Sequence, residues 1–208
     1  MNSSASAVPV PAGRRLAPHV RRAQLLAVAE EVFTRLGYQG TAVDDIASAA
    51  GVTRTLVYRY FADKDEIYLE CVRSARQELE EAFVAAALAQ SAPEDQLCAG
   101  IGAYFAFVRD RGQRWDMLFG AGSAVAGAVA GEVADLRYET AEKISGLVGA
   151  AIPSLAGDEA SAYAHAISGA CEQLAKWWRR HPAVGLNAVT DRAMTAIWAG
   201  LASVADAR

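Results

Sequence analysis

The chain has 208 residues, 53% of them hydrophobic, so it can bury a large core, and its formal net charge is −4. An acidic total argues against a nucleic-acid partner, yet the charge is unevenly distributed. Residues 1–64 carry eight Lys and Arg against five Asp and Glu, whereas the remainder carries twelve against nineteen, so the N-terminal end is basic.

Residues 1–18 are mostly Ser, Ala, Pro and Gly with two arginines, and they are too poor in large apolar side chains to order themselves. We expect a flexible arm, whose arginines either follow a DNA backbone or remain in solvent. The first helix is predicted over Val20–Leu36, where apolar residues recur on one face and Gly37 ends the pattern.

The next stretch, residues 41–64, is predicted to hold two short helices and the start of a third. Thr41 can cap the first short helix together with Asp44, three residues later. Gly51 then supplies the permissive backbone of a turn. Thr53 follows as the cap of the second short helix, which completes a helix-turn-helix.

The outward side of the second short helix carries side chains suited to a DNA groove. Guanidinium groups bind guanine edges or phosphates, and hydroxyl and phenol groups bind phosphate oxygens. Lys64 follows in the first turn of the next helix, after the cap Asp63, where a cation gains nothing from the helix dipole and a phosphate would supply its partner. The residues predicted to contact DNA are Thr41, Thr53, Arg54, Thr55, Leu56, Tyr58, Arg59, Tyr60 and Lys64.

This segment resembles the DNA-binding signature of TetR-family transcriptional repressors. The resemblance rests on DDIASAAGVTRTLVYRYFADKDEIY and covers roughly the first third of the chain. Its specific part is Ala-Gly-Val, a small polar residue, a variable run, then Tyr-x-Tyr-Phe and a lysine. One departure is the pair Asp44 and Asp45, which stands where such repressors often have a basic or neutral residue that touches phosphate.

After Asp63 the chain predicts helices separated by Gly and Pro. The first, to about Ala89, contains neither residue and forms a rigid rod out of the head. Further helices are predicted over Pro93–Arg111, Gln113–Phe119, Ser123–Ile152, Glu159–His181 and Thr190–Ala205. We therefore expect an all-α fold of about nine helices, with an arm (1–18), a three-helix DNA-binding head (19–64) and a helical ligand-binding and dimerisation domain (65–208).

The last two helices, residues 159–181 and 190–205, carry broad faces of small and large apolar residues. Such faces form either an internal core seam or a four-helix bundle with a second copy across a two-fold axis. The family resemblance implies the second arrangement. The resulting homodimer would place two recognition helices on a palindromic double-stranded DNA operator.

Aromatic and polar residues of the C-terminal domain are candidates to line a cavity for an unknown, largely apolar small molecule. Aromatic residues at helical spacing also form ordinary cores, so the same pattern fits packing without a ligand. The candidates are Tyr104, Phe105, Arg109, Trp115, Phe119, Arg137, Tyr138, Tyr163, His165, Glu172 and Trp177.

Other classes of function find little support in the sequence. The histidines have no spacing with cysteines or carboxylates that indicates a metal site, and no phosphate loop or nucleophile elbow is present, so we expect no enzyme, metal or cofactor. Three widely spaced cysteines indicate free thiols rather than a disulfide framework. With no signal peptide and no run long enough to span a membrane, a cytoplasmic protein is expected.

These observations predict a homodimeric repressor that a small-molecule inducer releases from its operator. Two alternatives stay open at this point. One is a helical-bundle enzyme or small-molecule carrier without DNA binding. The other is a DNA-binding protein of the same type that has no inducer.

Overall fold

A computed structural model describes residues 17–120, 127–155 and 157–206, and every regular element in these ranges is an α-helix, as predicted. Nearly all of the predicted arm lies outside the described residues. No helix in the described ranges combines the length and hydropathy that crossing a bilayer requires. The nine helices of these ranges are α1 (Pro18–Gly40), α2 (Val43–Ala49), α3 (Arg54–Tyr58), α4 (Lys64–Leu88), α5 (Pro93–Asp110), α6 (Gly112–Phe119), α7 (Ala128–Ala151), α8 (Asp158–Trp178) and α9 (Leu186–Asp206).

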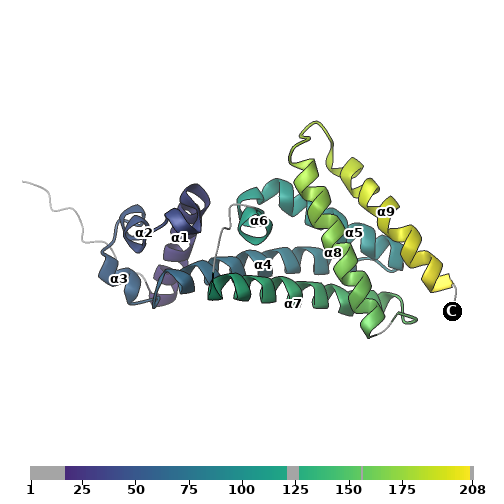
Figure 1. The fold of residues 1–208 in the computed structure, drawn as a ribbon, viewed down its shortest axis with the longest axis horizontal. Coiled ribbons are helices and arrows are strands. Elements are labelled where there is room, and N and C mark those ends of the chain that lie inside the picture. The colour runs from purple at the N-terminus through teal and green to yellow at the C-terminus, as the bar shows by residue number, and fades with distance from the viewer. Residues whose placement is uncertain (1–16, 121–126, 156, 207–208) are drawn as a thin grey trace, which may run out of the picture.

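The long helix α4 connects the two halves of the molecule (Figure 1). Helices α1, α2 and α3 gather around its N-terminal end, and α4 then runs beside α7 towards α8 and α9 at the opposite end. Along this path α4 packs against α1 and, further on, against α5, α6 and α7. The predicted rod is therefore continuous in the structure and belongs to both halves.

Two reciprocal hydrogen bonds fix the start of α4. The Asp63 carboxylate accepts from the backbone N–H of Glu66 at 2.8 Å, as expected for an N-cap. The Glu66 carboxylate in turn accepts from the backbone N–H of Ala62 at 2.5 Å. Both contacts satisfy amide groups that have no partner within the first helical turn.

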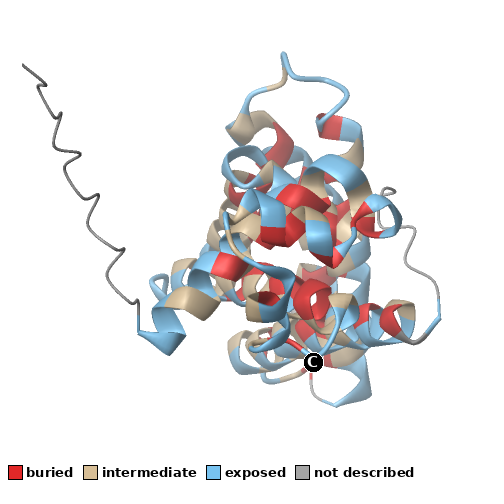
Figure 2. Ribbon diagram, turned by 90° about the vertical axis from the view of Figure 1, so that its left-hand side faces the viewer, coloured by how far each residue is buried: buried red, intermediate tan, exposed pale blue. Residues whose placement is uncertain are grey.

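The buried residues form one core that includes residues of the head and of the second half. Seen from the head end, they lie on the inward faces of the helices (Figure 2). In the head, Ile46 of α2 and Val57 of α3 are fully buried, and Ile67 and Val72 of α4 continue the same core. Burying a side chain of this size stabilises the fold by about 1.5–3 kcal/mol. The head is therefore attached to α4 by packing as well as by the chain.

Several helix boundaries depart from the prediction or lie outside the described residues. Helix α1 continues beyond Gly37, whose φ of 71° kinks it, to Gly40, and α8 ends at Trp178 and not at His181. Helix α9 begins at Leu186, one turn before the predicted Thr190. Thr190 is buried and donates its hydroxyl to the Leu186 carbonyl at 3.0 Å, so it bonds back within the helix rather than capping it. The predicted start of α7 at Ser123 lies outside the described residues, and the described helix begins after Gly127, whose φ is 72°.

The three cysteines are free thiols that differ in burial. Cys71 and Cys171 are buried, and burial raises the pKa of each thiol to about 12. Cys98 on α5 is half-buried, and partial burial raises its pKa as well. Since the thiolate is the reactive species and the reagent must reach it, Cys98 is the most reactive of the three.

We expect an aromatic disulfide reagent at mildly alkaline pH to label Cys98 first in the native protein. Cys71 and Cys171 should react roughly a hundredfold more slowly, because they are both inaccessible and protonated. Absorbance of the released thiol measures the two phases. The Cys98→Ser variant should lose only the fast phase, and labelling of Cys71 or Cys171 in that phase would contradict this assignment.

Candidate nucleic-acid interface and ligand cavity

The head holds α3 on its outer surface through a tight turn from α2. Gly51 in this turn has a φ of 64°, in the left-handed region that glycine adopts without strain. Thr53 then caps α3 as predicted, its hydroxyl accepting from the backbone N–H of Leu56 at 3.3 Å. With Val57 buried beneath, the opposite side of α3 is presented to solvent.

The exposed residues of this surface match the outward positions expected from helical spacing. Arg54, Thr55, Tyr58 and Arg59 are exposed, and Tyr60 is half-buried. Leu56 and Thr53, half-buried and exposed respectively, complete the predicted set on this helix. All seven residues lie on or directly beside α3 and are at least partly exposed, and their contact with DNA stays a prediction.

Arg54 is held in place by two neighbours. Its Nη1 donates to Oδ2 of Asp44 on α2 at 2.9 Å, and its Nη2 donates to the hydroxyl oxygen of Tyr58 at 2.9 Å. The guanidinium also lies 5.2 Å from the centroid of the Tyr58 ring. The hydrogen bond to Tyr58, followed by the charge of Asp44, raises the pKa of Arg54. Asp44 therefore orients the arginine but leaves a carboxylate on the same surface.

The predicted cap of α2 is wrong by one residue. Ala42 is the N-cap, and the Asp45 carboxylate accepts from its backbone N–H at 2.8 Å. Thr41 is instead buried and donates its hydroxyl to the Gly37 carbonyl at 2.7 Å, which satisfies the end of α1. In this conformation Thr41 presents no hydroxyl to solvent, so we leave it out of the proposed interface.

Lys64 has a partner within the protein, contrary to the expectation that only a phosphate would supply one. Its Nζ donates to the backbone carbonyl of Tyr38 at 3.0 Å and lies 4.3 Å from the centroid of the Tyr38 ring. The Tyr38 hydroxyl donates to Asp65 in the same turn of α4. A phosphate would thus approach an ammonium group that is already oriented by α1.

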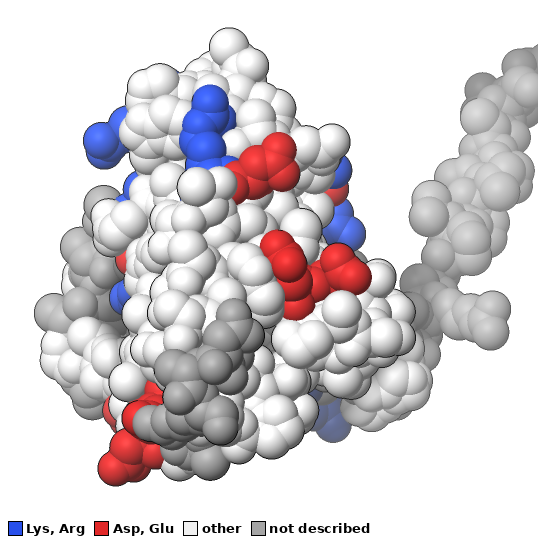
Figure 3. Space-filling view, turned by 90° about the vertical axis from the view of Figure 1, so that its right-hand side faces the viewer, with Lys and Arg blue, Asp and Glu red and all other residues white. Residues whose placement is uncertain are grey.

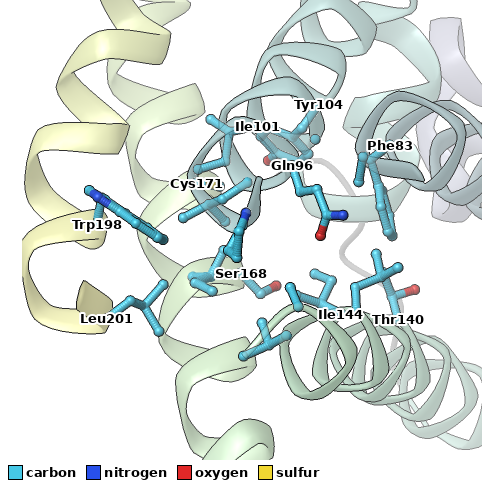
Figure 4. A pocket seen from close by; sticks show the side chains of 18 of the residues that line it. Phe83, Gln96, Ile101, Tyr104, Thr140, Ile144, Ser168, Cys171, Trp198 and Leu201 are labelled. Carbon is cyan, nitrogen blue, oxygen red and sulfur yellow. The ribbon is translucent and has the colours of Figure 1, made fainter. Parts of the chain in front are cut away.

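A second feature, in the C-terminal half, is a partly open cavity of about 100 Å³ between α4, α5, α7, α8 and α9 (Figure 4). It is smaller than the roughly 300–1,000 Å³ of typical small-molecule sites. A ligand of that larger size would have to move the surrounding helices. The lining includes Leu79, Phe83, Gln96, Ile101, Tyr104, Phe119, Thr140, Ile144, Ser168, Cys171, Trp198 and Leu201.

Only two of the eleven predicted ligand residues, Tyr104 and Phe119, line this cavity. Phe105 packs edge-on against Trp178 in the core, and Trp115 is buried and donates its indole N–H to the Tyr104 hydroxyl at 2.9 Å. These two residues support the wall from behind.

The other predicted ligand residues do not line the cavity, although the Arg137 guanidinium lies 5.2 Å from the centroid of the lining Phe119 ring. Arg109 is exposed and pairs with Asp110, and Tyr138 is 58% exposed. The prediction that all eleven share one cavity is therefore wrong, because most of the polar groups among them pair with other residues of the protein outside the lining. The remaining pairings are Arg137 with Glu172, Glu172 with Lys176, His165 with Glu142 and with the Tyr138 ring, and Trp177 with the His181 ring, while Tyr163 is half-buried against the core.

Behind the cavity wall a buried carboxylate joins α4 to α7. Glu80 accepts from the Thr140 hydroxyl at 2.7 Å and from Nζ of Lys143 at 2.5 Å, and it lies 3.3 Å from Nε of Arg76. A buried carboxylate requires such partners, because an unpaired one loses its hydration without compensation. Thr140 also lines the cavity, so the Glu80 contacts respond to any separation of these helices.

Helix α6 links the cavity to the head by a different route. Its Phe119 lines the cavity, and its Arg114 donates to both carboxylate oxygens of Glu30 on α1, at 2.7 and 2.8 Å. Arg114 also pairs with Glu78 on α4. This bidentate geometry is directional, so a shift of α6 would move α1 with it.

The part of the chain that the structure describes holds no group of three or more His, Cys, Asp or Glu residues arranged to bind a metal ion.

Two family models match the chain. Bacterial regulatory proteins of the tetR family match residues 25–71, and the tetracyclin repressor-like C-terminal domain matches residues 93–200. The HTH-type transcriptional activator FasR of Mycolicibacterium smegmatis is 33% identical over 51% of this chain and 49% of that protein. The HTH-type transcriptional regulator HbdR of an Aromatoleum species is 32% identical over 42% of this chain and 38% of that protein. The matches thus span half or less of these relatives.

Solved structures share the fold over most of the chain. A TetR-like transcriptional regulator from Rhodococcus sp. RHA1 has 26% sequence identity and a TM-score of 0.72, covering 90% of this chain and 99% of that one. The regulator FadR from Bacillus subtilis, in complex with stearoyl-CoA, has a TM-score of 0.73 at 17% identity and covers 84% of this chain and 96% of that one. The second likeness shows the fold alone.

We expect the Asp44→Asn variant to bind duplex DNA about threefold to tenfold more tightly at low salt, because it removes a carboxylate beside Arg54 from the surface predicted to contact DNA. Fluorescence anisotropy with a labelled duplex across a salt series measures this change. Asp135→Asn on α7 removes the same charge away from the head and is the matched control. Unchanged or weaker binding by the Asp44 variant alone would refute the role given to this carboxylate.

Proposed function

The chain belongs to the TetR family of bacterial regulatory proteins, and we propose that it is a repressor that binds a palindromic operator as a homodimer and is released by a small apolar molecule. The proteins named among its relatives are transcriptional regulators and not enzymes. The observation that carries the proposal is the exposed surface of α3, with Arg54 oriented by Asp44 and Tyr58.

In this proposal α3 enters the major groove. Arg54 and Thr55, in its first turn, read base edges, whereas Tyr58, Tyr60 and Lys64 bind phosphates. The ammonium of Lys64 is already aimed by Tyr38, which reduces the entropy lost on binding. Because the operator is bacterial DNA, the proposed location is the cytoplasm.

The proposed dimer forms through α8 and α9. Between Arg192 and Asp206 the sequence of α9 contains no charged residue, although several of its positions are exposed. The end of the molecule that carries α9 accordingly shows a broad uncharged area (Figure 3). Small side chains allow two helix pairs to approach closely across a two-fold axis. The exposed small residues of the two helices are Ala162, Ala166, Gly169, Thr195, Ala196, Ala199, Gly200 and Ser203.

A two-fold axis would pair two α3 helices for two half-sites. Half-sites lie one helical turn of DNA apart, about 34–36 Å, or a multiple of that distance. Release then requires only that the two heads leave this spacing. A ligand achieves this when it binds the conformer with the wrong spacing more tightly than the other. The shift in the equilibrium between the two conformers cannot exceed the ligand's difference in affinity for them.

The cavity is the proposed ligand site because α4 supplies part of its wall. Leu79 and Phe83 line it, and the same helix carries the head at its other end. A ligand larger than the free cavity pushes α4 away from α7, and α6 passes the same displacement to α1 through Arg114 and Glu30. The FadR fold neighbour was solved in complex with stearoyl-CoA, which supports the proposal that a protein of this fold binds a small molecule.

The proposed sign of regulation is repression, whereas the relative FasR is named an activator. A reporter placed behind an operator recovered by genome-wide pull-down tests this point directly. Transcription should rise when the gene for this chain is deleted. A fall would assign it the activating role instead.

An electrophoretic shift with a recovered palindromic operator should show strongly salt-dependent binding. The double variant Arg54→Ala, Tyr58→Ala should lose at least about a hundredfold in affinity, because it removes a base contact and a phosphate contact. The double variant Arg109→Ala, Tyr138→Ala removes the same exposed residue types from α5 and α7 and should bind normally. Equal binding by both would exclude α3 as the reading helix.

A larger side chain in the cavity should weaken the release of DNA by a ligand without weakening DNA binding itself. Ala87 on α4 lines the cavity, so Ala87→Met should weaken release by an apolar compound chosen in a thermal-shift screen by about tenfold or more, with operator affinity retained. Ala85→Met places the same side chain at an exposed position of α4 and is the control. An unchanged response in Ala87→Met would move the ligand site elsewhere.

A further inference from the structure

The cavity lining within the described residues carries no formal charge. Its residues are aliphatic, aromatic or neutral polar, without any Asp, Glu, Lys, Arg or His. Cys171 contributes a thiol whose pKa burial raises to about 12, so it too is neutral at physiological pH. An ionised group in this space would therefore lose its hydration without meeting a counter-ion.

Two polar lining groups are already engaged with the protein. The Thr140 hydroxyl donates to Glu80 at 2.7 Å, and the Glu80 carboxylate behind it is shared with Lys143 and Arg76. The Tyr104 hydroxyl accepts from the Trp115 indole N–H at 2.9 Å. The Thr140 proton is thus used within the protein, whereas the Tyr104 hydroxyl accepts a hydrogen bond and, among the described residues, keeps its own proton free to donate.

Two further polar groups remain available, one on each side of the space. The side chains of Gln96 on α5 and Ser168 on α8 both reach into the cavity (Figure 4). The Gln96 amide N–H donates to the Gln90 carbonyl at 3.0 Å, which leaves its carbonyl oxygen as an acceptor. Among the described residues Ser168 has no side-chain hydrogen bond, so its hydroxyl can donate or accept.

The half-buried end of the cavity also disfavours an anion. Pro93, Gln96 and Leu97 lie there at the start of α5, whereas Leu79 and Tyr104 at the other end are fully or nearly buried. The first turn of α5 carries Glu94 and Asp95, both exposed and next to Pro93 and Gln96. A negatively charged headgroup left outside the cavity would meet these carboxylates.

We propose that the cavity selects an uncharged apolar alcohol, an aliphatic chain or ring system whose single hydroxyl bonds Ser168 and the Gln96 carbonyl oxygen. A hydroxyl group suits these partners because it both donates and accepts. The inference rests on the proposed function in that it takes this cavity as the regulatory site. An uncharged ligand separates this chain from the Bacillus subtilis FadR structure, whose stearoyl-CoA carries the anionic phosphates of its CoA group.

The test uses the full chain and four straight-chain probes of equal length: decanol, methyl decanoate, decanoate and decyltrimethylammonium. Isothermal titration should show decanol bound tightest, methyl decanoate next, and the two ions roughly tenfold or more weaker than decanol. Decanoate or decyltrimethylammonium bound as tightly as decanol would overturn the proposal, and so would the absence of binding by all four probes.

Ser168→Ala supplies the second measurement. This variant should bind decanol about threefold to tenfold more weakly, because it loses one neutral hydrogen bond, and its affinity for decane should be unchanged. Ser145→Ala on α7, a half-buried serine outside the lining, is the matched control. Equal affinity of Ser168→Ala and the parent chain for decanol would remove Ser168 from the site and overturn the assignment.

An operator shift run with the same probes separates this inference from the proposed function. Release of DNA by decanoate but not decanol would overturn the inference and leave the regulatory role standing. Tight decanol binding by a chain that binds no operator would contradict the regulatory role and support the inference.

Discussion

The burial of one continuous face of α4 is the constraint on which the rest of the structure depends. Near the head that face packs Ile67 and Val72 into the same core as α2 and α3, and further along it packs Leu79 and Phe83 into the wall of the cavity. A close-packed interior resists gradual deformation and passes displacements on to its neighbours. A change in the cavity therefore reaches the head along a helix that has no glycine or proline to absorb it.

Carboxylates set the geometry at each of the places where this constraint acts. Glu80 joins α4 to α7 beside the cavity, Glu30 joins α1 to α6 through Arg114, and Asp44 orients Arg54 on the exposed surface of α3. The excess of acidic residues noted in the sequence thus coexists with a surface suited to DNA, because each of these carboxylates is paired with a cation. Of these three carboxylates, only Asp44 lies on the surface proposed to meet DNA, where its charge would oppose the phosphates.

The head was predictable from sequence because its signals are local. Gly51, Thr53 and Asp63 act through backbone conformation or through a bond to an amide three residues away, and all three behave as expected. Thr41 failed because its hydroxyl had two local choices and took the end of α1. The cavity was not predictable in the same way, since Leu79 or Ile144 has the same helical spacing whether it faces a filled core or an empty space. Aromatic residues at helical spacing indicated Tyr104 and Phe119, but no sequence pattern indicates Gln96 and Ser168, which line the cavity only because α5 and α8 meet there.

The shared core at the start of α4 also limits how this molecule can be recombined. The start of α4 buries Ile67, Tyr68, Leu69 and Val72, and the Tyr68 ring packs against the rings of Phe33 and Tyr38 of α1. The hydrophobic core of the head therefore does not end with α3 but extends into α4. A chimera that joined this head to a foreign domain immediately after Lys64 would replace these four side chains, and the α1 residues that pack against them would lose those contacts. A junction placed one to two turns beyond Val72 would carry the whole packing unit across, so biosensor designs built from this chain should be spliced within α4 and not before it.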